Sequence, residues 1–340
     1  MSRVPRETVL VTGGTGFIAG WCSVELLRRG YAVRATLRNR SKEAAVRAAI
    51  SSAVDASDRL TFVTADLTSD EGWSAAVEGC DFVLHVASPL GAGSSRNADA
   101  FIVPARDGTL RVLRAATSAG VRRVVMTSAA AAARPPVASG RVADEAIWAD
   151  PADPQFDAYR ISKILAERAA WDFMAASGGA TSFATILPGA VFGPVLTKEA
   201  LGSANIIQRL LDGRFSGMPR LGFSVVDVRD LADLHIRAMT APEAAGQRFI
   251  AAGEFVWMED IARTLRSQLG ARASKVPTRT LPDFVVRFLS LFVPSLRSLT
   301  PALGRVNTLP ADKARRLLGF SPRDVRATIV DCAESLLSGS

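Results

Sequence analysis

Short apolar runs alternate with longer segments of helical periodicity along residues 1–190. The apolar runs predict six strands, at residues 8–12, 32–37, 60–65, 81–86, 123–127 and 182–187. The segments between them predict helices, one ending at Arg29 and others at residues 41–53, 98–119 and 155–176. Strands that alternate with helices of this length form a parallel sheet covered on both faces. Since crossover connections are right-handed, we expect an α/β fold with a doubly wound parallel sheet.

Beyond Pro188 the pattern changes to mostly helical periodicity. Helices are predicted at residues 203–211, 229–239, 258–269, 281–292 and 324–337, with one further strand at 247–251 that could return to the main sheet. We therefore predict two units. A nucleotide-binding unit of Rossmann type would comprise residues 1–190 together with 224–251. A smaller, mostly helical unit of residues 191–223 and 252–340 would bind substrate and close over the ends of the sheet.

The composition is that of a globular protein, because 48% of the 340 residues are apolar. The three cysteines, Cys22, Cys80 and Cys332, lie far apart without metal-ligand or CxxC spacing. The first residues lead directly into the first strand without an apolar signal region. We therefore expect a cytoplasmic protein with reduced thiols and no bound metal.

The most apolar late stretch, residues 281–296, is interrupted by Asp283, Arg287 and two prolines. It falls short of the roughly 20 apolar residues that a membrane span needs. We interpret it as an amphipathic helix that packs on the protein, with membrane contact as the less favoured alternative.

The formal net charge of +8 raises the question of a nucleic-acid partner. Only 5 of the 41 basic residues are lysine, and the arginines are scattered along the chain with acidic residues between them. An electrostatic footprint for nucleic acid needs basic residues clustered on one face. The pattern therefore predicts a solvated surface, and we expect neither nucleic acid nor a membrane as a partner.

A glycine-rich turn, VTGGTGFIAG at residues 11–20, joins the first strand to the first helix. Gly13 permits a tight turn, and Gly16 lets the backbone approach phosphates that also gain from the helix N-terminus. Ala19 stands where a third glycine would let the helix pack close to the strand, and alanine often serves there. Because the motif follows a strand and opens a helix, it predicts a dinucleotide-binding turn.

The end of the second strand indicates which dinucleotide is bound. Enzymes that use NAD usually carry an acidic residue there, whereas this chain reads RATLRNRSK at residues 34–42. Arg38, with Arg40 or Lys42 nearby, would favour a ribose 2′-phosphate through charge-assisted hydrogen bonds. Surface arginine is the alternative interpretation, but the position and the missing acid favour NADP(H) over NAD.

The segment YRISK places Tyr159 and Lys163 four residues apart, and therefore on one face of a predicted helix. A lysine ammonium beside a tyrosine, together with the nicotinamide charge, lowers the pKa of the phenol and makes it a usable proton donor. The lysine can also hydrogen-bond the nicotinamide ribose. YxxxK alone is common, but the chain has only two tyrosines and five lysines, and the pair lies downstream of the fifth strand. We therefore interpret this pair as catalytic.

Together these motifs resemble the extended short-chain dehydrogenase/reductase superfamily, and within it the dihydroflavonol reductase, cinnamoyl-CoA reductase and aldehyde reductase branch. The resemblance covers nearly the whole chain. The segments that carry it, in family order and spacing, are VTGGTGFIAG, VRATLR, HVASP (85–89), VVMTS (124–128), YRISK, LPGAVFGP (187–194) and VVDVRDLADLHI (225–236).

The resemblance implies a role for each matching residue. For the dinucleotide, it implies that Gly13, Gly16, Phe17 and Ile18 hold the pyrophosphate and that Arg38 holds the 2′-phosphate. It implies further that Asp66 and Leu67 flank the adenine, that Val86, Ala87 and Ser88 line the ribose and nicotinamide side, and that Pro188 and Val191 set the nicotinamide face. We also count Lys42 and Thr127 among the cofactor-binding residues. For the reaction, it implies that Tyr159 is the proton donor and Lys163 its activator, both also in contact with the cofactor.

One position departs from the family pattern. The family usually reads TSS followed by a small residue, and the second serine hydrogen-bonds the substrate carbonyl, whereas this chain reads Thr127-Ser128-Ala129. Losing one such donor typically costs about 10²–10³ in rate. Either Ser128 has shifted register and serves the carbonyl, or Tyr159 acts alone, or catalysis is impaired. The two histidines, His85 and His235, are interpreted as structural, since the family's chemistry needs no imidazole.

We therefore expect NADPH-dependent reduction of a small aldehyde or ketone, hydrophobic or aromatic, by a monomer or homodimer. One alternative is a sugar-nucleotide epimerase or dehydratase on the same scaffold, which would need polar contacts to a nucleotide diphosphate in the second unit. The other is a non-catalytic NADP-binding regulator, an interpretation motivated by Ala129 and the basic surface.

Overall fold

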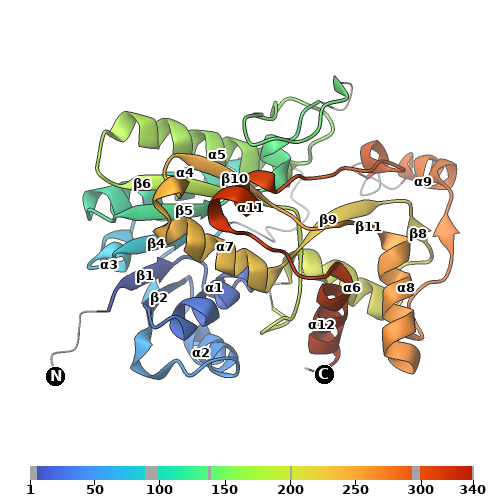
Figure 1. The fold of residues 1–340 in the computed structure, drawn as a ribbon, viewed down its shortest axis with the longest axis horizontal. Coiled ribbons are helices and arrows are strands. Elements are labelled where there is room, and N and C mark those ends of the chain that lie inside the picture. The colour runs from blue at the N-terminus through green and yellow to red at the C-terminus, as the bar shows by residue number, and fades with distance from the viewer. Residues whose placement is uncertain (1–5, 89–98, 137–138, 200, 293–298, 339–340) are drawn as a thin grey trace.

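Seven parallel strands form the central sheet of the computed structural model, which describes residues 6–88, 99–136, 139–199, 201–292 and 299–338 (Figure 1). Their order across the sheet is β10-β6-β5-β4-β1-β2-β3. The strands are β1 (Thr8–Val11), β2 (Ala32–Leu37), β3 (Leu60–Thr64), β4 (Phe82–His85), β5 (Arg123–Thr127), β6 (Ser182–Pro188) and β10 (Gln247–Ala251). The predicted doubly wound parallel sheet is confirmed, and β10 is the strand that returns to it.

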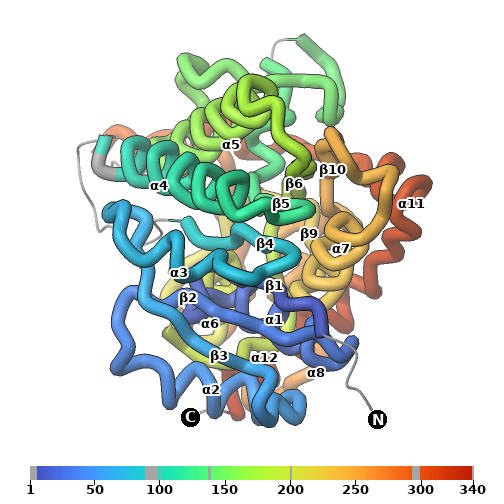
Figure 2. The backbone as a smooth tube through the Cα atoms, turned by 90° about the vertical axis from the view of Figure 1, so that its left-hand side faces the viewer, coloured from blue at the N-terminus to red at the C-terminus, as the bar shows by residue number. Residues whose placement is uncertain are grey.

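Helices cover both faces of this sheet. One face carries α1 (Phe17–Arg28), α2 (Glu43–Ser51) and α7 (Val228–Thr240), and the other carries α3 (Trp73–Val77), α4 (Asp99–Ser118) and α5 (Ala158–Ser177). Figure 2 shows α4 and α5 on one side of the strands and α7 on the other. Strands β4 and β5 are buried along their whole length, which explains their continuous apolar runs.

The rest of the chain is mostly helical, with two small sheets that the sequence did not predict. Its helices are α6 (Asn205–Leu211), α8 (Met258–Leu269), α9 (Asp283–Ser290), α11 (Asp312–Leu318) and α12 (Val325–Ser338). One small sheet contains β7 (Ala190–Phe192), β9 (Gly222–Asp227) and β11 (Phe255–Trp257), and the other contains β8 (Met218–Pro219) and β12 (Thr280–Leu281). Most of these strands are too short for an alternating pattern to show in the sequence.

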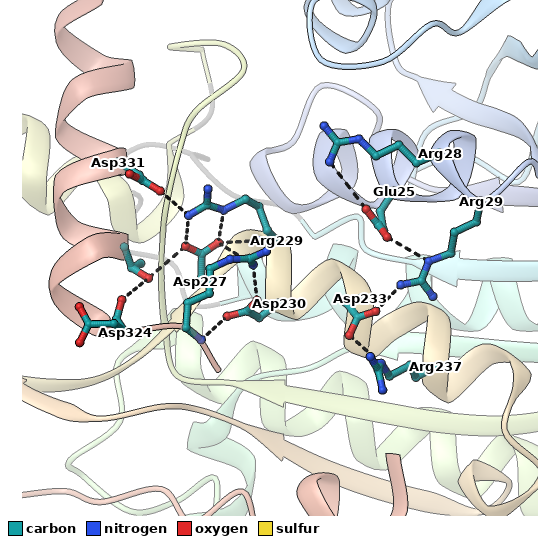
Figure 3. A network of polar contacts seen from close by, with 12 residues as sticks. Glu25, Arg28, Arg29, Asp227, Arg229, Asp230, Asp233, Arg237, Asp324 and Asp331 are labelled. Carbon is teal, nitrogen blue, oxygen red and sulfur yellow. Dashed lines mark hydrogen bonds and ion pairs between the residues drawn. The ribbon is translucent and has the colours of Figure 1, made fainter. Parts of the chain in front are cut away.

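A buried acid in the motif VVDVRDLADLHI joins the start of α7 to helix α12 (Figure 3). Asp227 caps α7, and its side chain is fully buried. Its two oxygens accept hydrogen bonds from the Arg229 guanidinium at 2.9 and 2.7 Å, and the Thr328 hydroxyl of α12 donates to Oδ2 at 3.0 Å. Arg229 also forms an ion pair with Asp331 of α12 at 2.6 Å. These bonds fix α12 against helix α7 on the central sheet.

Helix α9 differs from the expected helix that packs its apolar face on the protein. Val286 and Ser290 are buried, but Phe284 and Phe288 are 73% and 61% exposed. The helix therefore packs through a narrow face and leaves an aromatic face toward solvent. Within the described ranges, no helix is long and apolar enough to cross a bilayer. Residues 293–296 of the apolar stretch, and Pro89 of the HVASP motif, lie outside the described residues.

The three cysteines are all buried and unbridged. Burial raises the pKa of the Cys332 thiol to about 12 and that of Cys22 well above its ordinary value. These thiols therefore stay protonated and pack as small apolar groups. In the part of the chain that the structure describes, no group of three or more His, Cys, Asp or Glu side chains could hold a metal ion.

Candidate active site

The glycine-rich turn after β1 packs closely against neighbouring backbone atoms. Gly13 has a φ of +74°, in the left-handed region that favours glycine, and its N–H donates to Thr36 Oγ1 at 2.9 Å. A Cβ at Gly13 would lie 3.0 Å from the Cα of Ala87. The Gly13 carbonyl accepts from the Gly16 N–H at 2.8 Å. The turn is therefore tight, and a larger residue at position 13 would not fit.

The N-terminus of α1 is open toward this turn. Its N-cap, Gly16, offers no side-chain hydrogen bond, and the first helical turn contains no acidic residue. A small cavity lies over it, lined by residues that include Thr15, Gly16 and Phe17, and Phe17 and Ile18 are half-buried against the core. Free N–H groups and the helix dipole favour an anion at such a place. These residues therefore fit the pyrophosphate of a dinucleotide.

Arg38, directly after β2, is exposed and forms no hydrogen bond or ion pair within the described residues. Its basic neighbours are both occupied. Arg40 pairs with Glu43 at 3.5 Å, and Lys42 pairs with Glu199 at 2.8 Å. Of the three basic residues predicted to meet a 2′-phosphate, Arg38 is therefore the one whose charge is not already paired.

Asp66 and Leu67 follow β3 on the same edge of the sheet. The N–H and hydroxyl of Thr68 both donate to Asp66 Oδ1 at 2.8 Å, and these bonds, with a smaller contribution from Arg38, lower the pKa of Asp66. A Cβ at Gly108 of α4 would lie 2.6 Å from the Cβ of Leu67. Gly108 therefore lets α4 pack closely against the residues predicted to flank the adenine.

Residues 86–88 leave β4 half-buried beside the glycine turn. The Ala87 N–H donates to Thr12 Oγ1 at 2.9 Å, and the Thr12 hydroxyl lies 3.0 Å from His85 Nδ1. The other ring nitrogen lies 3.1 Å from the Thr109 hydroxyl, whose own proton goes to a carbonyl of α4. His85 therefore carries its proton on Nε2 and accepts at Nδ1. Burial lowers its pKa to about 3, so it supports the segment predicted to line the cofactor as a neutral group.

Helix α5 carries YRISK in its first two turns. Asp157 caps the helix with its side chain, so the helix begins one residue before Tyr159. Lys163 is buried, and its ammonium donates to the carbonyl of Thr127, the last residue of β5, at 3.0 Å. Burial lowers the pKa of Lys163 to about 8, and the Glu167 carboxylate opposes this shift. The lysine thus joins the helix to the carboxyl end of β5.

Tyr159 lies one helical turn before Lys163 and is 37% exposed. Burial raises its pKa, Asp157 raises it further and Arg160 opposes the shift. The pKa is raised because burial disfavours the charged phenolate and Asp157 lies close, while the Lys163 ammonium is bonded to Thr127. The lowered pKa expected from the sequence also includes the charge of a bound nicotinamide. Tyr159 is therefore protonated at neutral pH, which is the form that a proton donor needs.

The structure directs Ser128 away from a substrate carbonyl. Ser128 is 2% exposed, and its hydroxyl donates to Glu167 Oε2 at 2.6 Å. Glu167 is also buried, and it accepts from the Thr185 hydroxyl at 2.7 Å and from the Arg248 guanidinium at 2.9 and 3.2 Å. The hydroxyl is used within the fold. This argues against the expectation that Ser128 shifts register to meet the substrate.

Ala129 follows in extended conformation, with φ −151° and ψ 149°, and stands half-buried before the short helix η3 (Ala130–Ala133). Its side chain has no donor. Among the predicted catalytic residues, Tyr159 is therefore the one whose donor is not already bonded elsewhere in the described structure.

Pro188 and Val191 are both buried, Pro188 at the end of β6 and Val191 in β7. Val191 packs with the core that surrounds β1 and α1. The predicted site residues therefore gather along the carboxyl edge of the sheet, from β2 and β3 through β1 to β6. This is where ligands bind in open α/β sheets.

Sequence reasoning missed the buried partners behind the site. Thr12 and Thr36 support the glycine turn, and Glu167 and Arg248 hold Ser128. Two signals could have revealed the last pair. Glu167 repeats the four-residue spacing of YRISK, and Arg248 is a charge inside an apolar strand, which needs a buried partner.

Comparison with known proteins identifies the family. The model of the NAD dependent epimerase/dehydratase family matches residues 9–252. The chain is 33% identical to ketoreductase azaE of Aspergillus niger over 97% of this chain and 98% of that protein, and 35% identical to cinnamoyl-CoA reductase 1 of Oryza sativa subsp. japonica over 77% of this chain and 75% of that one. Yeast methylglyoxal/isovaleraldehyde reductase Gre2, solved in complex with NADPH, aligns with a TM-score of 0.81 and 26% identity over 98% of both chains. The chain therefore belongs to the NAD dependent epimerase/dehydratase family and is an NAD(P)-dependent reductase of its dihydroflavonol reductase, cinnamoyl-CoA reductase and carbonyl reductase branch.

Proposed function

We propose that this protein reduces an aldehyde or ketone to an alcohol with NADPH, and that Tyr159 donates the proton. The observation that carries the proposal is the placement of YRISK. Lys163 is buried against the carboxyl end of β5, and Tyr159 stands one turn earlier, protonated and partly exposed. The pair is thus held at the ligand-binding edge of the sheet.

The residues at the other end of this edge support NADP(H) as the cofactor. Gly13, Gly16 and the uncapped start of α1 fit the pyrophosphate, and the unpaired Arg38 fits a 2′-phosphate. A structural relative supports the same assignment, because Gre2 was solved with NADPH, and the name of ketoreductase azaE supports a carbonyl substrate. When bound, the cofactor supplies the hydride.

The chain's own contribution is to orient the carbonyl and manage the proton. As negative charge develops on the carbonyl oxygen, the Tyr159 hydroxyl donates its proton to that oxygen. Lys163 keeps its charge near neutral pH because Glu167 opposes the effect of burial. Its position favours contact with the nicotinamide ribose, so that it orients the cofactor beside Tyr159. The division into a nucleotide-binding unit (1–190 and 224–251) and a substrate-binding unit (191–223 and 252–340) is part of the proposal.

The test is NADPH oxidation with a panel of aromatic and aliphatic aldehydes and ketones. Replacing Tyr159 with Phe removes the proton donor and should lower kcat by about 10²–10⁴-fold while NADPH binding is kept. The chain offers a matched control in Tyr31→Phe, since Tyr31 is the other tyrosine and lies directly before β2. NADH should replace NADPH poorly.

Two outcomes would contradict the proposal. Full turnover in Tyr159→Phe would remove the proton donor from the mechanism. Tight NADPH binding without turnover of any carbonyl would favour a non-catalytic NADP-binding regulator, and activity that depends on a nucleotide sugar would favour an epimerase or dehydratase.

A further inference from the structure

We call the part of the site around the carboxyl end of β5, where the carbonyl substrate is proposed to bind, the carbonyl side. Arg134 lies on this side and takes part in none of the networks described above. It follows η3, which begins directly after Ala129, and its N–H donates to the Ala131 carbonyl at 3.3 Å. The short helix packs against α5, whose first turn carries Tyr159. The fold thus brings Arg134 to the same end of β5 as the proposed proton donor.

The guanidinium of Arg134 has no polar partner in the described chain. Its Nε is shut off from solvent and makes no hydrogen bond. Arg134 is half-buried as a whole. Two buried arginines are well bonded: Arg248 binds Glu167 and three backbone carbonyls, and Arg123 binds the Ser182 hydroxyl and two backbone carbonyls. Leaving a buried donor unpaired costs free energy. Arg134 is therefore an exception that is explained if a ligand supplies the partner.

The surroundings of Arg134 favour an anion as that ligand. Burial and the neighbouring Arg160 lower its pKa to about 10, so the side chain is still a cation at neutral pH. Arg160 itself is paired with Asp157 at 2.9 Å, and Asp157 also accepts from the backbone of α5. The four alanines of η3 that precede Arg134 belong, with Phe156, to a buried apolar cluster. A guanidinium in such a setting suits a planar carboxylate, which accepts two parallel hydrogen bonds.

We propose that Arg134 binds a carboxylate of the substrate, so that the preferred carbonyl compounds are acids. The inference rests on the proposed function and names a substrate class for it: an aldehyde or ketone with an apolar body and a carboxylate at the end remote from the carbonyl. Arg134 would fix the orientation of such a compound in front of Tyr159.

The kinetic test compares 4-carboxybenzaldehyde with its methyl ester, which differ mainly in charge. The wild-type protein should have the lower KM for the acid. Replacing Arg134 with Gln should raise the KM for the acid by about 10- to 100-fold, the worth of a charge-assisted pair, and change that for the ester by less than about threefold. Arg141→Gln, an exposed arginine of the same connecting segment, is the matched control and should change neither. Equal effects on acid and ester, or a wild-type preference for the ester, would overturn the proposal.

A binding test keeps this inference separable from the proposed reaction. Sodium benzoate should raise the thermal unfolding midpoint of the wild-type protein but not that of Arg134→Gln, while methyl benzoate should raise neither. If no carbonyl is reduced and benzoate still stabilises only the protein with Arg134, the reaction fails and the anion site stands. Benzoate that stabilises both proteins, or neither, overturns the anion site even where reductase activity is present.

The unliganded protein offers a third readout. Arg134→Met removes an unpaired cation from an apolar setting, so it should raise the unfolding midpoint without any ligand. A lowered midpoint would show that Arg134 has a structural partner in the fold, and would contradict the proposal.

Discussion

Strands β1 and β5 both lead into a threonine whose hydroxyl meets a buried histidine, yet the two threonines serve different sides of the site. Thr12 lies against His85 and accepts the N–H of Ala87, beside the predicted cofactor turn. Thr127 lies 2.7 Å from Nε2 of His235, and its carbonyl accepts from the Lys163 ammonium. In both places a neutral histidine holds a strand end, because burial lowers the pKa of His85 to about 3 and that of His235 to about 4.

The two sides differ in what they leave unpaired. On the cofactor side, the start of α1 is uncapped and Arg38 has no partner in the described residues. On the carbonyl side, Tyr159 and the Arg134 guanidinium are unbonded in the described residues, but Ser128 is bonded to Glu167, which is itself paired with Arg248. The comparison teaches that the groups proposed to meet a ligand stand free, whereas a polar group at the expected position can instead be part of the framework.

The largest expected effect concerns the framework on the carbonyl side. Arg248→Met leaves the Glu167 carboxylate buried without its ion pair, which should lower the free energy of unfolding by about 3–5 kcal/mol. Urea denaturation measures this loss. The same change at the exposed Arg38 should alter the free energy by less than about 0.5 kcal/mol. The double variant Arg248→Met, Glu167→Leu should recover most of the loss, and no recovery would show that Arg248 acts through its packing instead.

The same contrast explains what could be predicted from the sequence. On the cofactor side, the positions of Gly13 and Arg38 could be predicted because both residues follow a strand end closely in the sequence, and apolar runs indicate where strands end. The orientation of Ser128 was not, because it depends on Glu167, 39 residues away, and Glu167 depends on Arg248, another 81 residues along. Local patterns carry no signal for such pairs. For the same reason, the three-residue strands β7 and β11 became visible only through their pairing with β9.

The next effect concerns the free charge on the cofactor side. Arg38→Ala should raise the KM for NADPH by about 10- to 100-fold, as expected for the loss of a charge-assisted bond, and leave that for NADH nearly unchanged. Arg40→Ala is the matched control, because Arg40 is already paired with Glu43. Steady-state kinetics with both nucleotides measures the ratio of the KM for NADPH to the KM for NADH. An equal loss for NADPH and NADH would contradict the assignment of Arg38 to the 2′-phosphate.

A smaller gain is expected where the carbonyl side lacks a donor. Ala129→Ser places a hydroxyl at the position where the resemblance implies a serine, and it should raise kcat by about tenfold, less than a donor in an optimised site contributes. Ala130→Ser, the buried neighbour in η3, is the control and should bring no gain. The measurement is the kcat of both variants and of the parent protein with the best substrate of the carbonyl panel. A variant no faster than its parent would mean that Tyr159 alone serves the carbonyl oxygen.

The smallest effect tests whether the two histidines are equivalent supports. Both have a pKa below the ordinary 6.5, so the unfolded chain binds more protons than the folded one as the pH falls below 6.5. Their contribution to stability is therefore complete above that pH and is lost as the pH falls toward 4 and 3. Each histidine should therefore lower the free energy of unfolding at pH 6 by about 0.8 kcal/mol relative to pH 8, as measured by urea unfolding at the two pH values.

Substituting one histidine separates the two contributions. His235 lies 2.7 Å from the Leu231 carbonyl through Nδ1, which must therefore donate, so Nε2 accepts from Thr127. A glutamine offers one donor and one acceptor as well, and cannot take up a proton. His235→Gln should therefore halve the loss between pH 8 and pH 6, and His85→Gln should do the same from the cofactor side. An undiminished loss in either variant would mean that the replaced histidine is charged in the fold, and the two sides of the site would then differ in their supports as well as in their free groups.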